Sequence, residues 1–292
     1  MEQILNIAPF KIAIETDVPL VAQNLAAMYP EDAFLANTDA HLADYSIGQN
    51  YSSFFRRFVK PQSTFDFDQQ QPFLGQKENH SFASLEWGLN YVIASYALEY
   101  VIIHSGIVAY NDDAIIFPAP PGSGKSTLTA FLQGQPDWRL LSDEMALIKP
   151  HSQSAVPFVR PICLKNKSIE VTKGFYPNGT FSTIAANTHK GDVIHFKPSQ
   201  NSWDKRNDEA TIRAIVFPQY KPNAELEIVE LNQTQGFMQF AENAFNFNLL
   251  GKVGFDTLVK IIENAQIFEI TYSDVNDVKD FLQQDVLNAV TS

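Results

Sequence analysis

The sequence predicts a mixed α/β fold organised around a phosphate-binding loop, residues 119–127, which read A-P-P-G-S-G-K-S-T. The two flanks of the loop favour this fold class. The apolar run 114–117 before it has the pattern of a buried strand, and residues 126–132 after it suit the start of a helix. Elsewhere strands and helices follow one another without strict alternation, so we expect a mixed sheet instead of a wholly parallel one.

The residue types in this loop suit the binding of nucleotide phosphates. Its backbone N–H groups can point inward, a lysine can reach the outer phosphates, and a hydroxyl can hold a magnesium ion. The start of the following helix adds partial positive charge. The usual pattern, G-x-x-x-x-G-K-[ST], opens with glycine where this chain has Ala119, and a plain Gly/Ser turn is the alternative interpretation. The predicted phosphate-binding residues are Pro121, Gly122, Ser123, Gly124, Lys125, Ser126 and Thr127.

Bulk composition limits the class of partner. The 292 residues include 21 Lys and Arg against 33 Asp and Glu, a net charge of −12. This acidic balance argues against general binding of nucleic acid or of an anionic membrane surface, because both reward positive charge. The single cysteine, Cys163, is typical of a reducing compartment, and the N-terminal residues do not have the pattern of a signal peptide. We therefore expect a cytoplasmic protein.

A polar stretch, residues 69–80, suggests a boundary between two regions. We expect an α+β region over residues 1–80 that recognises a substrate or partner, and a nucleotide-binding catalytic domain over residues 81–292. Within the second region, residues 84–100 have helical spacing of apolar side chains, and residues 101–110 read as one strand that turns at 111–113 into the strand before the loop.

Asp143 and Glu144 supply the acidic groups that phosphoryl transfer requires. They lie at the end of an apolar strand, L-L-S-D-E, about twenty residues after the loop, where a neighbouring strand can bring carboxylates beside bound phosphates. One carboxylate can hold Mg²⁺ with Ser126, while the other accepts the proton of an attacking hydroxyl. The alternative is an exposed acidic turn at a strand end.

Further polar residues are candidates for the same site. His104 interrupts the apolar run V-I-I-H-S-G-I-V, either as a hydrogen-bonded core residue or as a partner of Asp143 or of the transferred phosphoryl group. Downstream, a group of basic and amide side chains could hold outer phosphates or an acidic substrate, although each taken singly reads as a surface group. These candidate substrate residues are Arg160, Lys165, Asn166 and Lys190.

Taken together, these motifs resemble a known family. H-S-G-I-V-A-Y-N-D-D-A-I-I-F-P-A-P-P-G-S-G-K-S-T, followed by R-L-L-S-D-E-M-A-L-I, resembles the catalytic core of HPr serine kinase/phosphorylase proteins. Over nearly its full length the chain is similar to the subgroup called HPr kinase-related kinase A. The blocks that carry this wider similarity are L-E-W-G-L-N, R-P-I-C-L-K-N-K-S-I, H-K-G-D-V-I-H, V-F-P-Q-Y and F-M-Q-F-A-E-N-A-F-N.

The resemblance implies a P-loop core of the phosphoenolpyruvate carboxykinase/HPr-kinase-like type with a smaller α+β N-terminal region. It implies ATP and Mg²⁺ as cofactors, with residues 122–127 on the triphosphate and Ser126 on the metal. Asp143 stands where the family's first acid is proposed to deprotonate the acceptor serine. Glu144 stands at the second acid, near the metal, and His104 at the histidine that supports the acidic pair.

Three features depart from the family pattern. The Ala119-Pro120-Pro121 opening replaces a glycine-led one, Glu144 is one methylene longer than the family's second aspartate, and no I-R-G-L-G-type stretch, linked there to phosphorylase action and subunit contacts, is found in the sequence. We therefore expect kinase activity in preference to reverse phosphorolysis. A homo-oligomer stays an open alternative.

The expected function is that of an ATP-dependent serine kinase, with Asp143, His104 and Lys125 as catalytic residues and a protein or peptide as acceptor. Two alternatives stay open at this point. The chain could be a kinase of small-molecule hydroxyl groups, or an ATP-binding regulatory module without turnover.

Overall fold

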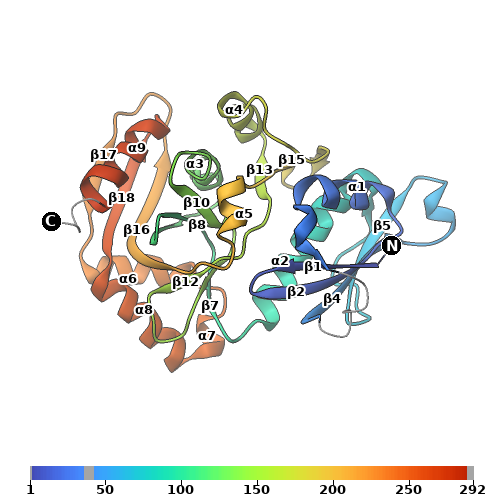
Figure 1. Ribbon diagram of the computed structural model, residues 1–292, viewed down its shortest axis with the longest axis horizontal. Coiled ribbons are helices and arrows are strands. Elements are labelled where there is room, and N and C mark those ends of the chain that lie inside the picture. The colour runs from blue at the N-terminus through green and yellow to red at the C-terminus, as the bar shows by residue number, and fades with distance from the viewer. Residues whose placement is uncertain (1, 36–42, 288–292) are drawn as a thin grey trace. The chain divides into compact units, whose positions relative to one another are not determined.

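The chain forms two compact units, each built from strands and helices (Figure 1). The computed structural model describes residues 2–35 and 43–287. Unit 1 consists of Met1–Ile93 and Arg160–Pro198, and unit 2 consists of Ala94–Val159 and Ser199–Ser292. The mixed α/β class expected from the sequence is confirmed. The division differs from the boundary expected near residue 80, because unit 1 continues into the helix that follows and includes a second, later segment of the chain.

Unit 1, in the part that the structure describes, contains a six-stranded sheet in the order β3-β1-β2-β4-β5-β6 and a three-stranded sheet in the order β13-β15-β14. Its main helix, α2, packs closely on β5, because a side chain at Gly88 would lie 2.2 Å from the Phe65 ring. The elements are β1 (Glu2–Ile7), β2 (Phe10–Glu15), α1 (Pro19–Met28), β3 (Phe34–Leu35), β4 (Tyr45–Tyr51), β5 (Gln62–Phe67), β6 (Gln76–Lys77), α2 (Ser81–Tyr96), β13 (Ile162–Lys165), α4 (Lys167–Phe175), β14 (Ala185–Thr188) and β15 (Gly191–Phe196).

Unit 2 is built on one mixed sheet that, within the described residues, has nine strands. Its central order is β10-β8-β9-β16-β12-β11-β7, and β18 with β17 is added beside β16. The elements are β7 (Val101–Ile103), β8 (Ser105–Tyr110), β9 (Asp113–Pro118), α3 (Lys125–Leu132), β10 (Trp138–Ser142), β11 (Ala146–Ile148), β12 (Ser154–Val156), α5 (Gln200–Asp204), β16 (Ala210–Tyr220), β17 (Glu227–Glu230), α6 (Gln233–Glu242), α7 (Phe247–Leu250), α8 (Lys252–Asn264), β18 (Gln266–Tyr272), α9 (Val275–Phe281) and a π-helical turn at Leu282–Leu287.

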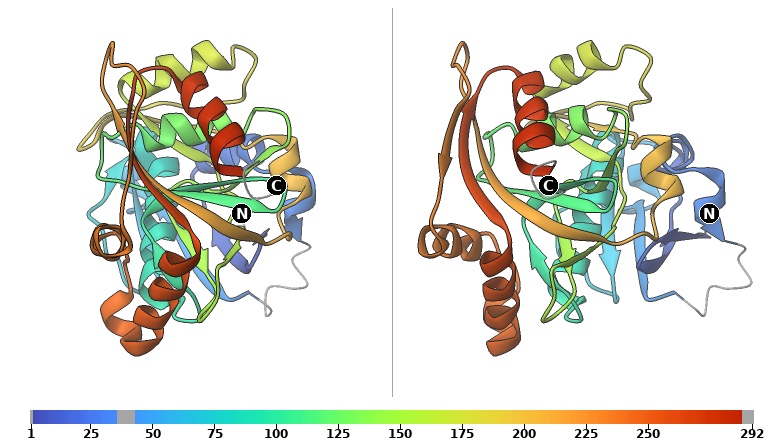
Figure 2. Two further views of the ribbon diagram at one scale, coloured as in Figure 1. Left: turned by 90° about the vertical axis from the view of Figure 1, so that its left-hand side faces the viewer. Right: turned by 60° about the vertical axis from the view of Figure 1, so that its left-hand side comes forward.

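Helices cover both faces of this sheet, and the alternation of side chains along β8 shows which helix covers which face. Gly106 faces α3, since a side chain there would meet Thr129. Ile107, the next residue, packs in the buried cluster that includes Phe240 of α6 and Leu258 of α8. In Figure 2, α6 and α8 lie together, while α3 lies beside α9. The glycine loop, defined as residues 119–124, therefore joins the sheet to the helix on its α3 face.

The strand expected over residues 101–110 is two strands. His104 separates β7, which pairs with β11, from β8, which pairs with β9 and β10. The backbone changes partners at this residue, and the His104 N–H donates a hydrogen bond to the carbonyl oxygen of Asn243 at 2.7 Å. The expected turn at 111–113 and the return strand β9 are confirmed.

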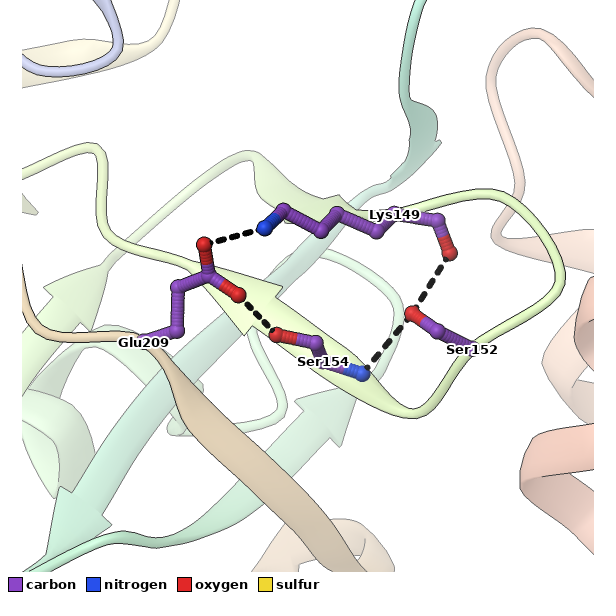
Figure 3. A network of polar contacts seen from close by, with 4 residues as sticks. All are labelled: Lys149, Ser152, Ser154 and Glu209. Carbon is purple, nitrogen blue, oxygen red and sulfur yellow. Dashed lines mark hydrogen bonds and ion pairs between the residues drawn. The ribbon is translucent and has the colours of Figure 1, made fainter.

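A polar network joins the β11–β12 turn to Glu209, the residue before β16 (Figure 3). Glu209 forms an ion pair with Lys149 and accepts a hydrogen bond from the Ser154 hydroxyl. The Ser152 hydroxyl donates to the Lys149 carbonyl oxygen at 2.9 Å and accepts from the Ser154 N–H at 3.1 Å, which closes the turn.

Within the described residues, no helix combines the length and the apolar character needed to cross a bilayer.

Candidate active site

Strand pairing brings three of the predicted site residues to one edge of the unit 2 sheet. Strands β9 and β10 are both antiparallel to β8, which lies between them, so they run in the same direction. Their carboxyl ends therefore meet at the edge where β8 begins, a usual position for ligand sites in α/β sheets. His104 precedes β8, Ala119 follows β9 and Asp143 follows β10, which places all three along this edge.

The glycine loop has the backbone conformation that its two glycines permit. Gly122 and Gly124 have φ angles of 89° and 95°, and Gly124 is the N-cap residue of α3. A side chain at Gly124 would also lie 2.7 Å from the Tyr272 hydroxyl. Other residues are strained at such φ values and would collide here. The loop therefore needs glycine at this position, and the N-terminus of α3 is left open to an anion.

Two tyrosines pack behind the glycine loop. Strands β16 and β18 are parallel, so their last residues, Tyr220 and Tyr272, lie opposite each other in register. The Tyr220 N–H donates to the Ser123 carbonyl oxygen at 2.9 Å, and the two rings are 5.9 Å apart. Burial, and to a lesser degree Tyr220, raises the pKa of Tyr272 well above its ordinary value, so this hydroxyl stays protonated. The sequence alone did not single out these tyrosines.

Lys125 is buried at the start of α3, with only 7% of its surface exposed. Its ammonium group lies 3.0 Å from His104 Nε2 and donates to the Ala119 carbonyl oxygen at 3.1 Å. Because an ammonium group can only donate, Nε2 is the acceptor in the contact with His104. The imidazole is therefore neutral and carries its proton on Nδ1. Phe245 lies against the same ring, with 5.2 Å between centroids.

Asp143 is 5% exposed at the end of β10, and Glu144 beside it is half-buried. The Ser142 hydroxyl accepts a hydrogen bond from the Met145 N–H at 3.3 Å, which fixes the turn that carries both acids. Helix α3 approaches this turn closely, because Gly106 has no side chain. The predicted acids and the predicted loop thus belong to one tightly packed corner of unit 2.

The candidate metal ligands are the Ser126 hydroxyl and the two carboxylates of Asp143 and Glu144. Within residues 2–35 and 43–287, no group of three or more His, Cys, Asp or Glu side chains is arranged to hold a metal ion. Mg²⁺ is commonly held by one or two carboxylates together with substrate phosphates and water. The oxygen donors present here fit an ion that arrives with a nucleotide.

Arg160 belongs to unit 1, where it forms a buried ion pair. Its guanidinium group lies 3.0 Å from a Glu86 carboxylate oxygen, and both side chains are nearly buried. Tyr29 donates a hydrogen bond to the other oxygen of Glu86 at 2.8 Å, and burial together with Glu86 raises the Tyr29 pKa well above its ordinary value. The charge of Arg160 is thus compensated inside the unit, an arrangement typical of structural ion pairs.

Lys165, Asn166 and Lys190 also lie in unit 1. Lys165 and Asn166 were expected close to Arg160, and Lys190 in a second polar cluster. Arg160 precedes β13, whereas Lys165 is its last residue, so the first grouping is corrected. Asn166 ties the β13 end to the β14–β15 turn, because its side-chain amide donates to the Lys190 carbonyl oxygen at 3.3 Å and accepts from the Asp192 N–H at 3.2 Å. The Lys190 ammonium group lies 4.9 Å from the centre of the Trp87 ring.

The corner around the glycine loop has the chemistry that a nucleotide and its metal ion require. The loop and the helix start supply an open helix N-terminus, a buried lysine and hydroxyl groups, and the end of β10 supplies two acids. Ser123 adds a buried hydroxyl without a hydrogen-bond partner among the described residues. The residues present therefore fit ATP and Mg²⁺. Comparison of the chain with protein-family models and with curated protein sequences finds no match.

Proposed function

We propose that the protein is an ATP-dependent phosphotransferase of the HPr-kinase-like type that transfers the terminal phosphoryl group to a hydroxyl group of a protein or peptide. The observation that carries the proposal is the position of Lys125. Its ammonium group is held at the start of α3 by His104 Nε2 and the Ala119 carbonyl oxygen. In phosphate-binding loops this lysine contacts the outer phosphates of the nucleotide.

Each group of residues in the site has its own role in phosphoryl transfer. Backbone N–H groups of residues 122–127 and the helix dipole orient the phosphates, and Lys125 offsets charge that develops during transfer. Asp143 orients the acceptor hydroxyl and accepts its proton. Ser126 and Glu144 hold the metal. Bound ATP supplies the phosphoryl group, and bound Mg²⁺ offsets its negative charge.

The phosphoryl transfer needs no reactant other than ATP and the acceptor. The acceptor oxygen forms a bond to the terminal phosphorus while the bond from that phosphorus to the bridging oxygen breaks. The electron pair of the broken bond leaves with ADP, and the hydroxyl proton passes to Asp143. A buried carboxylate at the same sheet edge as the glycine loop suits this role, since general bases contribute about 10²–10⁴-fold to such reactions.

The test is incubation of the purified full chain with γ-labelled ATP, Mg²⁺ and candidate acceptors, beside an Asp143→Asn variant. We expect label on a serine-containing peptide and loss of transfer in the variant by about 10²-fold or more. Label on a small hydroxy compound would show that the acceptor is a metabolite and not a peptide. ATP binding without transfer to any acceptor would contradict the enzyme and support a regulatory nucleotide-binding module.

A further inference from the structure

A pocket of about 650 Å³ lies beside the glycine loop in unit 2. It is lined by residues 118–123, by the carboxyl ends of β16 and β18, and by part of α6 and β17. Two of its lining residues contact each other, because Gln239 of α6 donates a 2.6 Å hydrogen bond to Glu269 of β18. Pockets that bind small ligands commonly measure about 300–1,000 Å³, so this one has room for a short segment of an acceptor.

The pocket borders residues 119–123 of the glycine loop, and these include the residue whose carbonyl oxygen contacts Lys125. In phosphate loops the lysine contacts the outer phosphates, and the residues at the helix start hold the inner ones. Here Lys125 contacts the carbonyl oxygen of Ala119, and Ala119 lines the pocket. Asn243 lines it as well, and its carbonyl oxygen accepts the N–H of His104, whose ring contacts Lys125. The position of the pocket therefore favours the acceptor over the nucleoside.

The charge of the pocket is acidic. Glu227, Glu242 and Glu269 line it, whereas none of the described lining residues is Lys, Arg or His. Carboxylates that converge on one cavity attract a cation and repel a phosphate or another carboxylate. The pocket thus selects against an acidic acceptor and in favour of a basic one.

Ser123 is a polar residue that the glycine loop and the pocket share. It lines the same pocket, is 9% exposed, and its hydroxyl has no hydrogen-bond partner among the described residues. Buried polar side-chain atoms in folded proteins are bonded in the large majority of cases. An unsatisfied hydroxyl at this place indicates that the loop is built to meet a ligand.

We propose that this pocket binds the phosphate acceptor through an ammonium or guanidinium group that lies next to the hydroxyl to be phosphorylated. The inference rests on the proposed phosphotransferase function, because it takes the glycine loop as the place of the phosphoryl donor. The same chemistry can come from a serine beside Lys or Arg in a peptide, or from a small amino alcohol.

The test is titration calorimetry on the full chain with a non-hydrolysable ATP analogue and Mg²⁺ present. The probes are a serine peptide flanked by lysines, the same peptide flanked by glutamates, ethanolamine, and ethylene glycol as its uncharged counterpart. The test variant combines Glu227→Gln, Glu242→Gln and Glu269→Gln. The control is Glu230→Gln, because Glu230 is an exposed residue of β17 that does not line the pocket.

We expect the lysine-flanked peptide to bind about tenfold more tightly than the glutamate-flanked one, the preference that two or three screened charge pairs provide. The triple variant should lose this preference and Glu230→Gln should keep it. Preferential binding of ethanolamine over ethylene glycol, with no peptide preference, supports the proposal with a small-molecule source.

Two results overturn the proposal. The first is equal affinity within both probe pairs. The second is a triple variant that keeps its peptide preference but binds the ATP analogue more weakly, because the pocket would then hold the nucleoside. A failure of the kinase proposal can be told apart from a failure of this one. In that case calorimetry would still show tighter binding of the lysine-flanked peptide, but no label from ATP would reach any acceptor.

Discussion

The ammonium group of Lys125 lies 3.0 Å from Nε2 of His104, so the cation of the glycine loop is positioned by a histidine that precedes a different strand. We predict that His104→Ala lowers ATP affinity about 10- to 100-fold, since a hydrogen bond to a charged group contributes about 1.5–3 kcal/mol. His104→Gln should keep most of the affinity, because its amide oxygen can accept the same bond. Calorimetric ATP titration of both variants checks this, and equal losses would contradict the acceptor role of Nε2.

Ala119 opens the loop where glycine is usual, and its local structure shows why alanine suffices. Ala119 is not among the described non-glycine residues with positive φ, and its contribution to Lys125 is a backbone carbonyl oxygen. We predict that Ala119→Gly changes ATP affinity by less than about twofold. The matched comparison is Gly124→Ala, which should abolish measurable binding, because position 124 has φ of 95° and no space for a side chain. A large gain in affinity for Ala119→Gly would show that the first position is not permissive.

Gly106 sets the distance between α3 and β8. A side chain at this position would lie 2.3 Å from the Thr129 hydroxyl, so Gly106→Ala should lower the free energy of unfolding by about 1–3 kcal/mol, the usual cost of overpacking. The double variant with Thr129→Ala should recover most of that loss, because the Thr129 hydroxyl has no hydrogen-bond partner among the described residues. Urea unfolding of the two single variants and the double variant measures the coupling; strict additivity would refute the contact.

Arg160 should act on stability and not on acceptor binding. Arg160→Ala leaves the buried Glu86 carboxylate without its cation, and we predict a loss of about 3–5 kcal/mol in unfolding free energy. Replacement of both partners, Arg160→Met with Glu86→Leu, should recover much of it. The control is Lys173→Ala, since Lys173 forms a solvent-exposed pair with Glu170 and lies 5.9 Å from the centre of the Phe181 ring, so its loss should shift stability by less than about 1 kcal/mol. If the Arg160→Ala variant has the same free energy of unfolding as the unaltered protein, Arg160 would again be a candidate for ligand binding.

Glu209 gives a pH-dependent prediction that is independent of the active site (Figure 3). Hydrogen bonds from Lys149 and Ser154 lower the pKa of Glu209 below its ordinary value of 4.5. A depressed folded-state pKa stabilises the protein above the unfolded value, and this stability is lost as the pH falls through the folded value. Because the pair is partly exposed, Glu209→Gln should cost only about 0.5–1 kcal/mol at neutral pH. Urea unfolding at neutral pH and near about pH 3 should show the difference shrinking in acid; a constant difference would argue against the ion pair.

Local sequence predicted the parts of the site that depend on neighbours along the chain. The strand, glycine loop and helix are contiguous, so apolar runs and glycine positions were enough to predict a helix start at Ser126, one residue after the observed start at Lys125. The strand before Asp143 was also recognised, although the sequence did not reveal that β8 lies between β9 and β10.

The remaining features depend on partners that are distant in the chain. Arg160 meets Glu86 across 74 positions, so its residue type alone resembled a ligand for anions. Tyr272 reaches Gly124 only because β18 pairs in parallel with β16. His104 divides an apolar run that reads as one strand, because the two halves pair with different neighbours. Pairing of this kind cannot be deduced from spacing or composition.

The interleaving of the two units has a consequence for how the chain is made. Unit 1 requires residues 160–198, which leave the ribosome only after the first segment of unit 2. Unit 2 in turn stays incomplete until β16 and β18 have been synthesised. Because domains tend to fold from the N-terminus during synthesis, two incomplete units with exposed sheet edges coexist during translation. A shortened chain that begins near residue 81 would lack most of the first segment of unit 1 and could not supply both units intact.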